Sequence, residues 1–165
     1  SSDLFRDSIL DGTERSVGKV IIKPGNGRIS IALPSGRNIV YLSPRISEQK
    51  KLISYIGKSG ISESFTADTP QITYCGKELH GGILTENIVQ GIARDLLVNA
   101  IFETEKKGHR VILHIHDEII AITPESQAKL TLNDMISAWR NVPDWAQGLV
   151  LNAEGIYGKN LLDIK

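Results

Sequence analysis

The stretch VILHIHDEIIAIT, residues 111–123, decides how the second half of this 165-residue chain is expected to fold. Valine and isoleucine dominate both of its apolar runs and no helical period fits them, so the runs indicate two strands. The polar residues between the runs predict a tight hairpin with Asp117 and Glu118 at its tip. A carboxylate in such a turn is rigidly held yet partly exposed, which suits a ligand of a hard divalent cation. The alternative is a plain polar turn, since Asp is a common turn residue.

The segment before this hairpin, residues 84–107, predicts one long helix that ends with Gly108 as its C-cap. Its apolar residues cover a broad arc, which predicts a mostly buried helix: Ile88, Val89, Ile92, Ala93, Leu96 and Ala100. Asn87, Gln90 and Arg94 follow the spacing i, i+3, i+7 and share a polar stripe beside that arc. On a buried helix this stripe is costly unless it meets a polar partner, and the alternative is a solvated face.

Weaker patterns predict the remaining elements. Residues 1–12 have the pattern of the end of a helix, and strands are expected over residues 18–22, 28–33 and 38–42. Residues 50–82 are polar and rich in Ser and Gly, which predicts a long mobile connection with short pieces of structure. Thr123 as N-cap and Pro124 at the first helical position predict another helix, followed by a final strand over residues 149–154. Together these elements predict an α+β fold, an antiparallel sheet with two long helices packed on one face.

The composition sets limits on function. Lys plus Arg and Asp plus Glu both number 19, so no bulk positive charge points to nucleic acid. The single cysteine, Cys75, excludes an internal disulfide. No apolar segment is long enough for a membrane span and no secretory leader is visible, so we expect no membrane partner and a cytoplasmic location.

Four segments together resemble one protein family. They are GGILTENIVQGIARDLL (81–97), LHIHDEI (113–119), IALPSGRNIVY (31–41) and PDWAQGLVLNAEG (143–155). Taken in chain order, they resemble the C-terminal palm segment of family A DNA polymerases, the relatives of DNA polymerase I, and in particular the phage and prophage branch. The likeness extends from about Ile29 to Gly158. A bare His-Asp-Glu motif is weak, but four pieces in the same order are specific.

The resemblance implies an organisation and a chemistry. Residues 1–82 would connect fingers to palm, with a β-hairpin at about 28–43 and the mobile stretch at about 50–82, and residues 83–165 would be a palm subdomain with a catalytic hairpin. The implied reaction is template-dependent deoxynucleotidyl transfer with two Mg²⁺ ions, in replication or repair. The implied partners are primer-template DNA, deoxynucleoside triphosphates and the remainder of the polymerase, inside a bacterial or phage-infected cell.

Specific residues match the motifs of the family. By this resemblance Asp117 would be the metal-binding carboxylate, Glu118 a supporting residue near the primer terminus, and His116 a residue that orients the primer end. Gln90 would approach the minor groove, where hydrogen-bond acceptors occupy similar places in every correct pair. Arg94 would contact a phosphate or brace Glu118, and Asn87 would belong to the same DNA-facing row.

Two motifs of the family do not occur in this chain: the earlier palm strand with a second catalytic aspartate, and the fingers helix with its Lys and Tyr. We therefore expect the isolated chain to be inactive. One alternative function is a non-catalytic DNA-binding or assembly module with a palm fold. Another is a different metal-dependent phosphotransferase or nuclease, which needs a third carboxylate from Asp95, Asp134 or Asp144. A zinc site at His114 and His116 is a further alternative, and it needs additional ligands.

Overall fold

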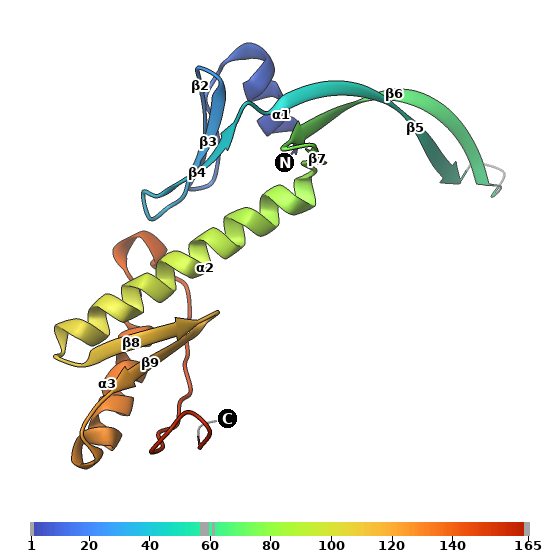
Figure 1. Cartoon of the computed structure of the whole chain (residues 1–165). Coiled ribbons are helices and arrows are strands. Elements are labelled where there is room, and N and C mark those ends of the chain that lie inside the picture. The colour runs from blue at the N-terminus through green and yellow to red at the C-terminus, as the bar shows by residue number, and fades with distance from the viewer. Residues whose placement is uncertain (1, 57–59, 61, 164–165) are drawn as a thin grey trace. The chain divides into compact units, whose positions relative to one another are not determined.

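The computed structural model describes residues 2–56, 60 and 62–163, and the chain divides into two compact units, Ser1–Ile88 and Val89–Lys165. Figure 1 shows the elements in chain order. All strand pairing among the described residues is antiparallel. The predicted α+β class is therefore confirmed. The strands do not form one sheet, however, but a four-stranded, a three-stranded and a two-stranded sheet within the described part of the chain.

The first unit begins with helix α1 (Ser2–Asp11) and a four-stranded meander. Its strands are β1 (Arg15–Val17), β2 (Val20–Gly25), β3 (Arg28–Ala32) and β4 (Asn38–Leu42). Period-two alternation buries Ile29 and Ile31 of β3, as predicted. The expected strand at residues 18–22 begins later, because Gly18 and Lys19 form the turn that joins β1 to β2. Gly18 has a φ of 58°, which glycine adopts without steric cost.

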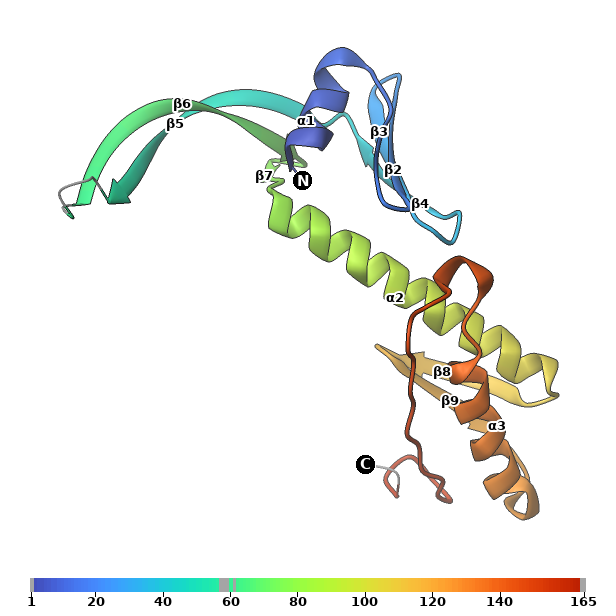
Figure 2. The same ribbon diagram turned by 180° about the vertical axis from the view of Figure 1, so that it is seen from behind.

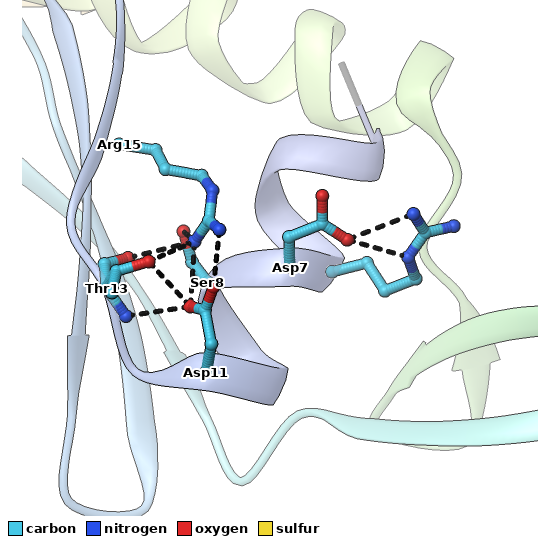
Figure 3. Close-up of polar contacts among 6 residues, drawn as sticks. Asp7, Ser8, Asp11, Thr13 and Arg15 are labelled. Atoms are coloured by element: carbon cyan, nitrogen blue, oxygen red, sulfur yellow. Dashed lines mark hydrogen bonds and ion pairs between the residues drawn. The ribbon is translucent and has the colours of Figure 1, made fainter.

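A polar cluster joins the end of α1 to β1 (Figure 3). The Asp11 carboxylate accepts hydrogen bonds from Arg15 Nη1 at 2.9 Å and from the backbone N–H of Thr13 at 2.9 Å. Arg15 also donates to the buried Ser8 hydroxyl at 3.3 Å. The hydrogen bonds from Arg15 and then Thr13 hold the pKa of the Asp11 carboxyl far below its usual range. This cluster therefore fixes the direction in which the chain leaves α1.

The segment after β4 forms a long ribbon, β5 (Arg45–Ile56) and β6 (Ser62–Tyr74), with a short third strand β7 (Lys77–Glu78). The two long strands pair without interruption from Arg45↔Thr73 to Ile56↔Ser62. The prediction that residues 50–82 hold only short pieces of structure is therefore wrong. The two strands pair through their backbones along the whole ribbon, and this pairing stabilises them although their side chains are mostly polar. The expected mobility stays a prediction, and residues 57–59 and 61 lie outside the described residues.

Helix α2 (Gly81–Lys106) begins before the expected Leu84 and ends one residue before the expected Lys107, with Gly108 at its C-cap as predicted. Gly108, with a φ of 87°, donates to Glu105 O, and His109 donates to Thr104 O, which is the hydrogen-bond pattern of a Schellman C-cap. Leu96 and Ala100 of the predicted apolar arc are buried, but Val89 is 59% exposed and Ala93 is exposed too. These two residues lie where α2 enters the second unit, and the predicted apolar arc is not buried there.

The second unit adds a hairpin and a second long helix. Strands β8 (Arg110–Ile115) and β9 (Glu118–Ile122) form the hairpin, and η1 (Glu125–Gln127) leads into α3 (Ala128–Arg140). Both α2 and α3 lie beside this hairpin in the two views (Figure 1, Figure 2). The two helices are joined by polar contacts, because Asn99 Nδ2 donates to Asn141 O at 3.1 Å and Asn141 Nδ2 donates to Glu103 Oε2 at 2.9 Å.

Two predictions for this unit are wrong. Pro124 occupies the N-cap of η1, and Thr123 instead accepts a hydrogen bond from the Thr131 hydroxyl at 2.9 Å. Residues 149–154 are not a strand, although all of them are described, and the short helix η2 (Asp144–Ala146) precedes them. Val150 in this segment is 92% exposed. An apolar sequence becomes a strand only with a partner strand, and none pairs with this segment.

Candidate active-site hairpin

The candidate site lies at the turn between β8 and β9. Ile115 and Glu118 form the last cross-strand pair, so the loop consists of His116 and Asp117 alone. His116 has a φ of 52°, as the first position of the tightest hairpin turns requires. The predicted tight hairpin is present, but Glu118 is the first residue of β9 and does not share the tip with Asp117.

The two side chains of the turn and the first side chain of β9 are open to solvent. His116, Asp117 and Glu118 are exposed, and none makes a side-chain hydrogen bond or ion pair with the described residues. No lysine or arginine of the described chain therefore neutralises either carboxylate. The carboxylates of Asp117 in the turn and of Glu118 at the start of β9 are available to a cation or to a hydrogen-bond donor from outside this chain.

Side-chain alternation separates the residues of the hairpin into two faces. Directly paired residues share a face, so Glu118 lies with Ile115 while His114 lies with Ile119 on the opposite face. The Arg94 guanidinium of α2 reaches the His114 face. Its Nη1 lies 3.1 Å from His114 Nδ1, and its Nη2 lies 3.1 Å from His114 Nε2. Arg94 thus contacts His114 and makes no hydrogen bond or ion pair with Glu118.

The polar stripe of α2 is divided between the two units. Asn87 belongs to the first unit, where its Nδ2 donates to the Tyr41 hydroxyl at 2.9 Å. Burial raises the pKa of the Tyr41 phenol, and the hydrogen bond from Asn87 opposes that rise. Tyr41 also packs edge-on against Phe5 and Tyr74 at centroid distances of 5.3 and 5.2 Å. Asn87 therefore has a structural partner in the first unit, and Gln90 and Arg94 are exposed residues of the second unit.

The alternative metal chemistries need ligands that the described residues do not bring together. No group of three or more His, Cys, Asp or Glu side chains able to hold a metal occurs within residues 2–56, 60 and 62–163. Asp134, a candidate third carboxylate, instead accepts from His109 Nε2 at 2.8 Å and pairs with Lys107 at 3.4 Å. The hydrogen bond from His109 and the contact with Lys107 keep the pKa of Asp134 below its usual value. His109 precedes β8, so its partner Asp134 lies near the end of β8 that is opposite the turn.

Sequence reasoning missed the role of His114 as the partner of Arg94. His114 entered only as half of a possible His-x-His zinc pair. The sequence contained no short-range signal for the contact, because the two residues are far apart in the chain and lie on different elements. Only the packing of α2 beside the hairpin brings them together.

Comparison with known proteins finds a distant similarity to a phage DNA polymerase. A DNA polymerase of Bacillus phage SP02 is 31% identical over 135 residues, an alignment that covers 79% of this chain and 19% of the phage polymerase. The chain therefore spans about a fifth of the curated relative that it matches. No family model matches the chain. No solved structure matches it either.

The chain is therefore a segment of mixed α and β structure that is distantly similar to part of a phage DNA polymerase. Among the described residues, no helix is long and apolar enough to cross a membrane.

Proposed function

We propose that this chain is the palm portion of a DNA-directed DNA polymerase and supplies one metal-binding carboxylate, Asp117. The observation that carries the proposal is the match to a phage DNA polymerase, combined with an unpaired carboxylate on a two-residue turn. The reaction would be template-dependent addition of deoxynucleotides to a primer 3′-hydroxyl, in replication or repair. The partners would be primer-template DNA, deoxynucleoside triphosphate and the rest of the polymerase.

The carboxylate of Asp117 is the type of ligand that Mg²⁺ prefers, but the described residues supply too few such ligands to complete a site. Mg²⁺ prefers carboxylate, water and phosphate oxygens, and Asp117 offers such oxygens without a competing cation. The described residues add no cluster of further ligands around it. Asp117 would therefore hold metal together with a carboxylate outside this chain and with the triphosphate. When bound, two Mg²⁺ ions would lower the pKa of the attacking hydroxyl and stabilise the charge that develops on the phosphate.

The neighbouring residues would hold the primer end in place. Glu118 begins β9 and lies next to Asp117, where it would support the primer terminus. His116 would orient the backbone at that terminus, from a position that the tight turn makes rigid. Gln90 would approach the minor groove from the exposed part of α2, and Arg94 would contact a phosphate. Asn87 is the weakest member of this row, because its amide already donates to Tyr41.

Primer extension tests the proposal directly. The chain is assayed with Mg²⁺ and four deoxynucleotides, first alone and then with a separately expressed segment that carries the upstream aspartate and the fingers motif. We expect extension only in the mixture, and Asp117→Asn should abolish it. Glu154→Gln is the matched control, because Glu154 is also an exposed carboxylate of the second unit without a described partner. Extension by the pure chain alone, or full activity of Asp117→Asn, would refute the assignment of Asp117.

A second candidate is a non-catalytic DNA-binding or assembly module. It is favoured by the absence, among the described residues, of any cluster of metal-binding side chains around Asp117. The two functions differ in their dependence on metal. Tight DNA binding that survives removal of Mg²⁺ and the Asp117→Asn change, with no extension in the mixture, would identify the module.

A further inference from the structure

The contact between Arg94 and His114 differs from the ion pairs that several other basic side chains make in this protein. Arg6 pairs with Asp3 and Asp7, Arg15 pairs with Asp11, and Lys107 pairs with Asp134. In each of these pairs a carboxylate neutralises the cation. Arg94 has no ion pair with a described residue, and its guanidinium is held by an imidazole alone.

An imidazole orients a guanidinium without cancelling its charge. A neutral ring has one unprotonated nitrogen that can accept a hydrogen bond from Arg94, and the other nitrogen carries a proton. The positive charge of the exposed guanidinium therefore remains available to an anion. A flexible arginine that is already held in place also loses less side-chain entropy when that anion binds.

We propose that His114 is a positioning residue that holds the Arg94 guanidinium ready for a backbone phosphate of bound DNA. The proposal rests on the proposed function, which places DNA near the hairpin. Two elements build the contact, since Arg94 belongs to α2 and His114 to β8. The pair also lies on the hairpin face opposite Glu118. The phosphate site is therefore separate from the face that carries Glu118.

The contact requires the neutral form of His114. A protonated imidazole offers no acceptor and would place two cations 3.1 Å apart. The group that faces His114 from α2 is Arg94 itself, and the titratable groups of the hairpin turn are His116, Asp117 and Glu118. Glu118 points to the other face of the hairpin. The neutral imidazole is therefore the form that holds Arg94.

The test measures both the order of Arg94 and the affinity of the full chain for a fluorescein-labelled primer-template duplex. Nitrogen-15 relaxation of the Arg94 side chain reports its order without DNA. We expect His114→Leu to make Arg94 mobile and to weaken DNA binding about threefold to tenfold. Arg94→Gln should weaken binding and lower the slope of log affinity against log salt by about one. The double variant should bind no more weakly than Arg94→Gln.

Two further variants make the result specific. His114→Gln keeps a neutral hydrogen-bond acceptor, so it should restore both Arg94 order and affinity. Arg110→Gln removes another exposed arginine of β8 and should leave affinity and salt slope near those of the wild type.

The possible outcomes separate this inference from the proposed function. Unchanged Arg94 order in His114→Leu, failure of His114→Gln to rescue, or additive losses in the double variant would overturn the positioning role. A wild-type chain that does not bind the duplex even at low salt would overturn the proposed function, and the phosphate role of Arg94 with it. The relaxation data would then test only whether His114 restrains the Arg94 side chain.

Discussion

Two hairpins of this protein, the β5–β6 ribbon and the β8–β9 hairpin, have the same antiparallel connectivity and very different sequences. In β8–β9, valine and isoleucine are concentrated on both sides of a two-residue turn. In the ribbon, apolar residues are scattered among Ser, Thr, Lys and Glu, and nearly all of β5 is exposed. The comparison teaches that hydrophobic concentration identifies a strand that packs against a core. A strand stabilised mainly by pairing with its neighbour gives a weak sequence signal.

The largest expected difference between the two hairpins is functional. In the proposed reconstituted polymerase, Asp117→Asn at the β8–β9 turn should reduce primer extension on the order of a thousandfold, because the carboxylate proposed to bind metal is lost. Asp68→Asn in the ribbon, opposite Lys50, should leave the rate near that of the wild type. Steady-state extension kinetics measure both. Equal losses would show that Asp117 has no special role.

The next difference concerns the two ends of the ribbon. Ile72 is 5% exposed near the base, whereas Phe65, farther along, is 51% exposed. Ile72→Ala should lower the free energy of unfolding of the first unit by about 3 kcal/mol, because it leaves a cavity in a packed core. Phe65→Ala should change it by less than about 1 kcal/mol. Urea titrations provide the values, and a larger loss from Phe65→Ala would mean that the ribbon tip is covered by another part of the protein.

Substitution by glycine should change stability in opposite directions in the two hairpins. His116 adopts a left-handed φ of 52°, so His116→Gly should stabilise the second unit by about 1 kcal/mol. Thr66 lies in the extended backbone of β6, so Thr66→Gly should destabilise the ribbon by a similar amount, about 1 kcal/mol. Thermal unfolding distinguishes them. Destabilisation by both would indicate that the His116 side chain itself holds the turn.

The smallest expected effect is a dependence on pH at the start of the first unit. The pKa of Asp11 is lowered by Arg15 and Thr13, so its contribution to stability is present above the ordinary carboxyl value and is lost as the pH falls through the lower folded value. Asp11→Asn should therefore lower the melting temperature at neutral pH, with a difference from wild type that shrinks below about pH 4. A difference that is constant across this range would contradict the assigned contacts.

Local signals were sufficient for a definite part of the fold and of the site. The run of β-branched residues around Asp117 predicted both strands and the turn, and Gly108 predicted the end of α2, because these features depend on neighbouring residues alone. The α+β class followed from the same patterns. The short-range signals failed at residues 149–154, where an apolar sequence has no partner strand, and at Thr123, which bonds to Thr131.

The sequence by itself determined the hairpin, the long helix and the distant similarity to part of a DNA polymerase, since periodicity, turn chemistry and motif order are properties of the chain alone. The tertiary structure alone decided which side chains meet. It placed Asn87 against Tyr41, Arg94 against His114 and Asp134 against His109. The physical reason is that each of these contacts joins residues far apart in the chain, so its geometry depends on how whole elements pack.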